Sequence, residues 1–119
     1  GVTVSLTDDL ESAYDALRPM LGFYVGGMGS KDRNFHKELM ARMGFPEQAQ
    51  KIQDEFLAGN RAEAIAAVPN EFIDEIALIG SRERIRDRLQ AWTDSRVTTM
   101  LVHAADPTKL QEIAELVMD

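Results

Sequence analysis

The chain has 119 residues, of which 45% are hydrophobic and 28% charged, and its net charge at pH 7 is −7. That length suffices for one domain with its own core. The acidic balance disfavours nucleic acids and anionic membranes as partners. The absence of cysteine excludes disulfides and thiolate chemistry and fits a reducing compartment. With no signal peptide and no membrane-spanning apolar run visible, we expect a soluble, cytoplasmic protein.

The first predicted elements are a strand and a long helix. Apolar and polar residues alternate from Val2 to Leu6, which predicts a half-buried strand. Asp8 is placed to cap the helix, with Glu11 at the reciprocal position of a capping box. Its apolar face is formed by Leu10, Ala13, Tyr14, Leu17, Met20, Leu21 and Tyr24. Pro19 predicts a kink or a break near Arg18.

Glycine and proline divide the middle of the chain. Three glycines among residues 26–29 predict that the helix ends in a Gly-rich loop over 26–31. A second helix is expected over about 32–43, stopped by Gly44, and a third from Pro46 to Gly59. Two short helices should follow over about 61–68 and 70–77. The side chains expected to face inward include Phe35, Leu39, Met40, Met43, Ala49, Ile52 and Phe56.

The last third predicts a helix, a strand and a helix. Ser81 is a good N-cap for a helix that turns Ile85, Leu89 and Trp92 inward. The apolar run over 98–104 has the length and β-branched start of a buried parallel strand. Asp106 should cap the final helix, with Pro107 at its first position. That helix is expected to turn inward Leu110, Ile113, Leu116 and Val117.

The predicted fold class is mainly α with one or two short β-strands. Strands that are each followed by a helix are typical of βα units, whose parallel strands are joined by crossovers. Because a complete barrel of eight such units needs about 250 residues, we interpret the chain as the C-terminal fragment of a (β/α)8 TIM-type barrel. It would be a single partial domain over 1–119, with a helical insertion at 34–77 and a last αβα segment at 81–119. The exposed strand edges predict the remainder of the barrel, or a second copy of the chain in a dimer, as partner.

Two segments are candidate anion sites. Gly26, Gly27 and Gly29, with Lys31 and Arg33 nearby, could cradle the phosphate of a cofactor tail, although such glycines are more often only a stop and a turn. Ser81 and Arg82 begin a helix, where the first N–H groups favour negative charge, although Ser81 could be no more than the cap.

Other polar residues have simpler interpretations. His103 ends the predicted last strand, which in a barrel points toward the active-site mouth, and His36 is expected on the surface. No metal site is predicted, because neither histidine has a partner at ligand spacing. Steps of two residues place the arginines at 82, 84, 86 and 88 on alternate sides of a helix, so we expect a salt-bridged solvent surface. Asp8, Asp9 and Glu11 are explained by the helix dipole.

Several motifs together resemble the C-terminal part of luciferase-like oxidoreductases, and most closely the branch that uses the deazaflavin coenzyme F-420. They are the string from Phe23 to Gly29, Asn34-Phe35, Ile79-Gly80-Ser81 with Ile85 and Arg88-Leu89, and the run from Thr99 to Val102. The resemblance implies a barrel whose cofactor sits at the carboxyl ends of the strands and exchanges hydride with an organic substrate. This segment would contact the cofactor tail, through Gly26, Gly27, Gly29, Lys31, Ser81 and Arg82.

The resemblance assigns no catalytic residue to this chain, since the early strands supply them in that family. The isolated segment is therefore expected to be inactive and to bind little cofactor. An enzymatic alternative is the flavin mononucleotide (FMN) monooxygenase branch, which shares the barrel. An alternative of another class is a free-standing helical interaction module, because most of the chain is predicted to form amphipathic helices.

Overall fold

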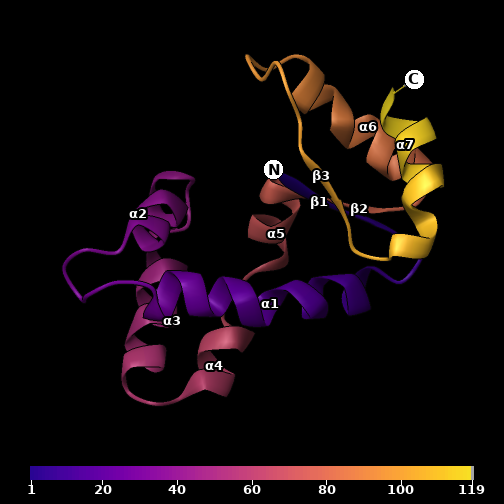
Figure 1. Cartoon of the computed structure of the whole chain (residues 1–119). Coiled ribbons are helices and arrows are strands. Elements are labelled where there is room, and N and C mark those ends of the chain that lie inside the picture. Colours follow the sequence, from indigo (N-terminus) through magenta and orange to yellow (C-terminus); the bar gives the residue numbers. More distant parts are fainter. Residues whose placement is uncertain (119) are drawn as a thin grey trace. The chain divides into compact units, whose positions relative to one another are not determined.

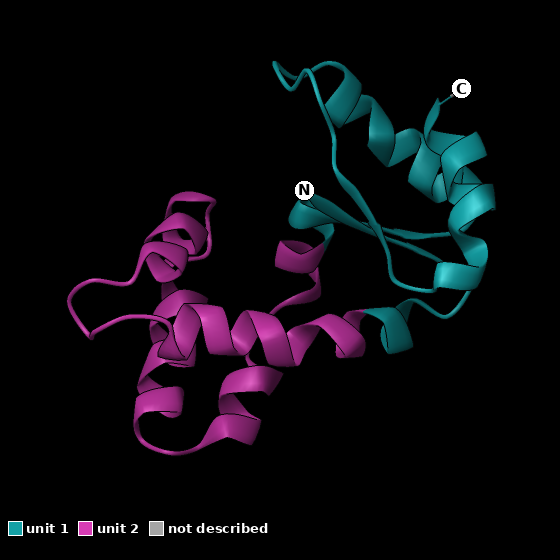
Figure 2. Cartoon of the chain, in the orientation of Figure 1, with its two compact units in different colours: residues 1–13, 74–119 teal, residues 14–73 magenta. Residues whose placement is uncertain are grey.

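A computed structural model describes residues 1–118 of the chain. They fold into two compact units, which Figure 2 shows in different colours. We call residues 1–13 and 74–119 the sheet unit, and residues 14–73 the helical unit. Of the residues described, no helix is long and apolar enough to cross a membrane.

The sheet unit is built on three parallel strands, β1 (Val2–Leu6), β2 (Ala77–Gly80) and β3 (Val102–Ala104). Their order is β2-β1-β3, so β1 is the central strand (Figure 1). Three helical segments complete the unit, α6 (Arg82–Thr93), the 3-10 helix η1 (Pro107–Lys109) and α7 (Leu110–Met118). The core lies on one face of the sheet and consists of Val2, Val4, Leu78, Ile85, Ile113 and Leu116. The strand predicted over Val2 to Leu6 is thus confirmed, with Val2 and Val4 on the buried side.

Strand β2 is the element that the sequence did not predict. The helix predicted over about 70–77 includes only Ala77, and no strand was predicted for Leu78 to Gly80, because so short an apolar run has no periodicity of its own. In the structure, α5 (Asn70–Ile76) ends one residue before the strand, and all four strand residues are buried. The prediction of one or two strands was therefore wrong, because the sheet has three. The strand that was missed is β2, which pairs with residues 3–6 of β1.

Strand β3 is shorter and more exposed than predicted. Only Val102–Ala104 forms a strand, and Leu101 just before it is 71% exposed. β3 pairs with β1 through only three residues, whereas the other edge strand, β2, pairs through four and is fully buried. Leu110 is likewise 54% exposed, so its predicted inward position was wrong, whereas Ile113 and Leu116 are buried.

The strand order differs from that of a simple barrel segment. Successive strands of a β/α barrel are neighbours in the sheet. Here β1 lies between β2 and β3, which is the order of an open sheet whose strand sequence reverses beside its first strand. In open sheets of parallel strands, ligands bind outside the carboxyl ends of the strands at such a reversal.

The helical unit contains most of α1 (Leu10–Gly27), together with α2 (Phe35–Arg42), α3 (Pro46–Leu57), α4 (Arg61–Ala66) and the start of α5. Pro46 begins α3 as predicted, and the positive φ of Gly44 provides the expected stop before it. The side chains buried inside this unit include Leu21, Val25, Met40, Ala49, Ile52, Val68 and Ile73.

Helix α1 differs from the prediction at Pro19 and at its C-terminal end. The prediction was a kink or a break near Arg18, and the structure excludes the break, because α1 runs through Pro19; packing of the buried Leu21 and Val25 offsets the backbone hydrogen bond that proline removes. It also includes Gly26 and Gly27, which were predicted to lie in a loop. The cause is the close approach of Phe56 from α3, because a Cβ atom on Gly26 would lie 2.6 Å from Phe56 Cβ.

Helix α2 begins later than predicted because Asn34 is its cap. The buried Asn34 side chain accepts a hydrogen bond from the Lys37 N–H at 3.0 Å and donates one to the Val25 carbonyl at 2.6 Å. This contact fixes the rotation of α2, which buries Met40. Phe35 is left 65% exposed and Leu39 37% exposed, so the prediction that both face inward was wrong.

Candidate functional site

A pocket of about 670 Å³ lies at the carboxyl ends of β1 and β2. Three chain segments line it, each following a strand: residues 6–9 after β1, residues 81–83 after β2, and Lys109 with Glu112 after β3. This volume is within the range of small-molecule sites. The pocket therefore stands where parallel sheets generally bind their ligands.

Short hydrogen bonds hold these segments together. The Thr7 N–H donates to the Gly80 carbonyl at 2.9 Å and extends the β1–β2 pairing past the strand ends. The Lys109 Nζ donates to the Leu6 carbonyl at 2.7 Å, which ties η1 to the end of β1. Gly80 has a φ of +130°, and this backbone conformation turns the chain from β2 into α6.

Each helix that starts at this edge is capped by a side chain. Ser81 Oγ accepts from the Arg84 N–H at 3.2 Å, which confirms the predicted cap of α6, and Asp106 caps η1 as predicted. The cap of α1 is Asp9, not Asp8, because Asp9 accepts from the Ser12 N–H at 3.2 Å and from Ser12 Oγ at 2.7 Å. Thr7 Oγ1 accepts from the Asp9 N–H and fixes this choice.

The charges around the pocket are mixed, with acidic groups in excess. Four carboxylates line it, from Asp8, Asp9, Glu83 and Glu112, against two cations, Arg82 and Lys109. The Arg82 guanidinium pairs with the Glu112 carboxylate at 3.0 Å across the pocket, and both side chains are about half exposed. A pair this exposed contributes little to stability, so Arg82 can exchange Glu112 for an anionic ligand at small cost.

The first turn of α6 supplies further donors. The backbone N–H groups of Arg82 and Glu83 are the first two of the helix and have no acceptor within it. They lie beside the Arg82 side chain, in the part of the pocket where the helix dipole favours negative charge. An anion is thus better placed at α6 than at the start of α1, where the Asp9 carboxylate already occupies the helix end.

Two of the caps predict how stability depends on pH. Hydrogen bonds from the Ser12 hydroxyl and N–H lower the pKa of Asp9, and those from Thr108 lower the pKa of Asp106, below the usual 3.8. Since the folded-state pKa is the lower one, the stabilisation is complete above the unfolded value and is lost as pH falls through the folded value. We expect the free energy of unfolding, measured in urea, to decrease below about pH 4.

The double variant Asp9→Asn with Asp106→Asn should show a shallower decrease, because amides do not titrate. The control is Glu63→Gln, whose carboxylate has no hydrogen-bond donor beside it among the residues described. It should keep the slope of the unchanged chain. An equal slope in the double variant would contradict the role given to these caps.

The predicted glycine site lies in the helical unit and is organised by packing. Gly26 and Gly27 belong to α1 and face Phe56, so they make no open loop. The buried Gln53 holds the segment that follows, since its side-chain amide donates to the carbonyls of Ser30 and Lys31 and accepts from Lys37 Nζ.

Several donors of this segment are already used inside the chain. The N–H groups of Met28, Ser30 and Arg33 donate to the carbonyls of Phe23, Arg33 and Ser30 respectively. The Lys31 and Arg33 side chains remain exposed, and Gly29 has a φ of +146°. A phosphate role for Gly26, Gly27, Gly29 and Lys31 stays a prediction, and the geometry gives the first two glycines a packing role.

The histidines and the arginines of α6 also have defined places. His103 is exposed in β3, and His36 is half-buried and stacked on Tyr24 at 4.9 Å between ring centres, so its predicted surface position was only partly right. Arg84 and Arg88 are half-buried as well. Arg84 pairs with the Asp74 carboxylate at 2.8 Å, and Arg88 donates to the Asp74 carbonyl at 3.0 Å. Within residues 1–118 no group of three or more histidine or carboxylate side chains could hold a metal ion.

Comparison with known proteins now places the chain in a family. Residues 1–99, which include β1, β2 and α6, match the family described as luciferase-like monooxygenase. The chain belongs to the luciferase-like family. The match ends before β3, so the part of the pocket contributed by Lys109 and Glu112 lies outside the residues matched.

One curated protein is similar to this chain over most of its length. It is a protein of Mycobacterium tuberculosis named "Putative coenzyme F420-dependent oxidoreductase", and it is 32% identical over 114 residues. The alignment covers 96% of this chain and 33% of the relative, so the chain spans about a third of that protein's length. No solved structure matches the chain.

Of the predicted site residues, the luciferase-like sheet unit brings only Ser81 and Arg82 to the pocket. Sequence reasoning missed Thr7 and Lys109, although a signal existed. Both residues come shortly after predicted strands, and parallel strands bring the segments at their carboxyl ends to one edge. Asp8 and Asp9 were noticed, but they were explained by the helix dipole and, for Asp8, by a predicted cap.

Proposed function

We propose that the chain is the C-terminal segment of an F-420-dependent oxidoreductase of the luciferase-like family. In the intact protein this enzyme transfers hydride between the deazaflavin and an organic substrate. The observation that carries the proposal is the pocket at the carboxyl ends of β1 and β2, in a chain whose family and relative are both oxidoreductases. The family supports oxidoreductase chemistry, and the relative's name supports the cofactor.

The residues of the pocket fit the anionic tail of such a cofactor. The first two N–H groups of α6, the Arg82 guanidinium and the Lys109 ammonium can each contact a phosphate oxygen. When bound, the deazaflavin supplies the carbon that accepts or gives the hydride. This chain's residues would bind and orient the tail, and Glu112 would release Arg82 as the phosphate enters.

If the intact protein is a barrel, β3 must have a different neighbour from the one it has here. In a barrel, β3 would have to lie beside β2, whereas here it pairs with β1 through three residue pairs, Val2–Val102, Thr3–His103 and Val4–Ala104. Because only three residue pairs join β3 to β1, another strand can replace β3 beside β1 at little cost. We therefore propose that the remaining strands of the intact protein displace β3 from β1, and that they also supply the catalytic side chains.

The proposal predicts a binding defect in a variant of the intact protein that contains this segment. Replacing Arg82 with glutamine should raise the dissociation constant for the oxidised deazaflavin about tenfold, because one charge-assisted contact to the tail is lost. Fluorescence titration measures it. The matched control is Arg86→Gln on the exposed side of the same helix, which should leave the constant unchanged.

The same protein distinguishes the alternatives. Loss of the deazaflavin's visible absorption on adding a hydride donor, and its return on adding an acceptor, supports the proposal. Retention of FMN with oxygen consumption would assign the chain to the monooxygenase branch instead. Binding of neither cofactor would contradict both enzymatic proposals and favour the helical interaction module.

A further inference from the structure

Two hydroxyl groups stand at the carboxyl ends of the adjacent strands β1 and β2. Thr7 directly follows β1, and Ser81 directly follows β2. The last residues of the two strands, Leu6 and Gly80, are paired, and the Thr7 N–H donates to the Gly80 carbonyl at 2.9 Å. Since paired strands lie about 4.8 Å apart, Thr7 and Ser81 are close neighbours. Both residues line the pocket of about 670 Å³.

Each of these hydroxyl oxygens is held by a backbone N–H group. Thr7 Oγ1 accepts from the Asp9 N–H at 3.1 Å, and Ser81 Oγ accepts from the Arg84 N–H at 3.2 Å. A hydroxyl group also has one proton to donate. Within residues 1–118, neither of these two hydroxyl protons has an acceptor. The backbone therefore fixes both oxygens, while both protons remain for a ligand in the pocket.

Other hydroxyl groups at this edge of the sheet are used differently. Ser12 Oγ donates to the Asp9 carboxylate at 2.7 Å, and Thr108 Oγ1 donates to the Asp106 carboxylate at 2.7 Å. These protons are consumed inside the caps of α1 and η1. The difference identifies Thr7 and Ser81 as groups that complete their hydrogen bonds with something outside the chain.

The ligand that suits these two donors is an oxyanion. Arg82 and Lys109 place a guanidinium and an ammonium group in the same pocket, and the first N–H groups of α6 add backbone donors. A phosphate oxygen accepts hydrogen bonds and carries negative charge, so phosphate satisfies the hydroxyl, backbone and cationic donors together.

The four carboxylates of the pocket leave these donors available. Asp9 accepts two hydrogen bonds within the cap of α1, and Glu112 pairs with Arg82 at 3.0 Å. Asp8 and Glu83 are exposed, so water reduces their repulsion of an anion. An anion that enters therefore exchanges with Glu112 at Arg82 and finds both hydroxyl protons without an acceptor among the residues described.

We propose that Thr7 and Ser81 form a pair of hydroxyl donors that binds the phosphate of the cofactor tail between the ends of β1 and β2. The pair rests on the proposed function, which supplies the cofactor. Each hydroxyl donates to one phosphate oxygen while its own oxygen stays on the backbone. Donors fixed on two neighbouring strands determine where the phosphate sits, which the longer side chains of Arg82 and Lys109 do less sharply.

Titration of the 119-residue chain with inorganic phosphate at constant ionic strength tests the pair. The backbone amide resonances of Arg82 and Glu83 should shift and saturate, with a dissociation constant in the millimolar range. Thr7→Val and Ser81→Gly should each raise that constant about tenfold, because each removes a hydrogen bond to a charged group. Valine keeps the shape of threonine, and glycine is nearly as good as serine at a helix start, so α1 and α6 should still form.

Two further variants separate hydrogen bonding from packing. Thr93→Val makes the same change on α6 outside the pocket, where the hydroxyl donates to the Leu89 carbonyl, and should leave the constant unchanged. Thr7→Ser keeps the hydroxyl and should stay within about twofold of the unchanged chain. Circular dichroism melting confirms that each variant compared is folded. Equal constants for Thr7→Val, Ser81→Gly and the unchanged chain overturn the proposal, as does an absence of saturation at about 50 mM phosphate.

The intact protein identifies the source of the phosphate. Inorganic phosphate should compete with the oxidised deazaflavin in a fluorescence titration, because both use the same two hydroxyl groups. A deazaflavin affinity that phosphate does not change would exclude the cofactor tail as the ligand of the pair and overturn the proposal. The two proposals fail separately, since an intact protein that binds no deazaflavin contradicts the proposed function, whereas the phosphate titration of the chain decides on the hydroxyl pair.

Discussion

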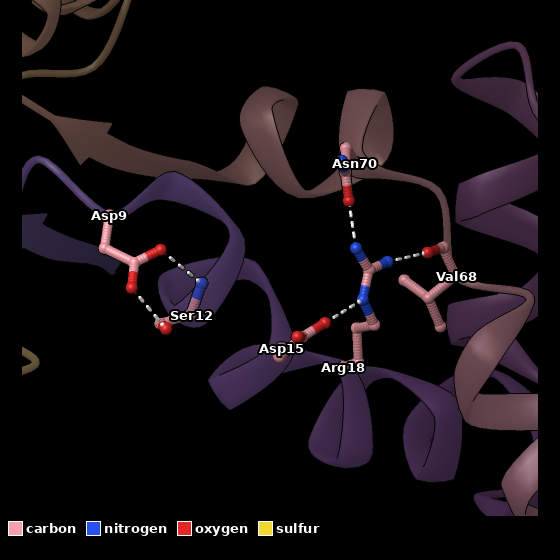
Figure 3. A network of polar contacts seen from close by, with 6 residues as sticks. All are labelled: Asp9, Ser12, Asp15, Arg18, Val68 and Asn70. Carbon is pink, nitrogen blue, oxygen red and sulfur yellow. Dashed lines mark hydrogen bonds and ion pairs between the residues drawn. The ribbon is translucent and has the colours of Figure 1, made fainter.

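Replacing Arg18 with methionine should lower the free energy of unfolding by about 3 kcal/mol. The Arg18 guanidinium donates to the Val68 carbonyl and to the Asn70 side-chain carbonyl, and its Nε pairs with Asp15 at 3.0 Å (Figure 3). These bonds fasten α1 to the link between α4 and α5. Methionine keeps the aliphatic bulk but leaves the two acceptors without this donor, and the Arg18 side chain is only 14% exposed.

Two further variants distinguish the ion pair with Asp15 from the hydrogen bonds that Arg18 donates to Val68 and Asn70. Asp15→Ala removes the exposed ion pair alone and should cost about 0.5 kcal/mol or less. Arg86→Met removes an exposed arginine of α6 that has no partner among the contacts described, and it should leave stability unchanged. Urea unfolding followed by circular dichroism measures all three. A loss below about 1 kcal/mol in Arg18→Met would show that water replaces the guanidinium at this link.

Local signals in the sequence predicted most helix starts, because a cap acts over three or four residues. Ser81 and Asp106 cap as expected, and Pro46 and Gly44 mark a start and a stop. The choice between Asp8 and Asp9 could not be made in this way. It depends on the hydroxyl of Thr7, which holds the Asp9 N–H and which a capping-box pattern ignores.

Features set by distant residues could not be predicted. β2 was missed because the four residues Ala77–Gly80 carry no periodicity of their own, and only the pairing with β1 makes them a strand. The same holds for the pocket. Its cap and Arg82 were found from the sequence, whereas Lys109 reaches it through a bond to Leu6, 103 positions away.

The Gly-rich stretch over 26–31 is a feature whose role depends on distant residues. Replacing Gly26 with valine should lower the free energy of unfolding by about 3 kcal/mol. The new Cβ would lie 2.6 Å from Phe56 Cβ and 3.1 Å from the Ile52 carbonyl oxygen, so α3 must move away from α1. A phosphate cradle at Gly26 would instead predict weaker cofactor binding with unchanged stability. Urea unfolding of the chain therefore distinguishes packing from binding at this glycine.

The side chain that would clash with a valine at residue 26 is Phe56, so a variant without the Phe56 side chain tests this explanation. Phe56→Gly removes the clashing Cβ together with the ring, and alone it should destabilise the chain because it leaves a cavity beside Gly26 and Gly27 and places a glycine inside α3. In the double variant, the valine enters the space that the ring vacates, so the combined cost should be smaller than the sum of the two single costs. Ala16→Val, on the exposed side of α1, shows what a valine costs in this helix where nothing clashes with it, and that cost should be only about 0.5 kcal/mol. Additive costs in the double variant would mean that Gly26 and Phe56 act independently, and the glycine would then need another explanation.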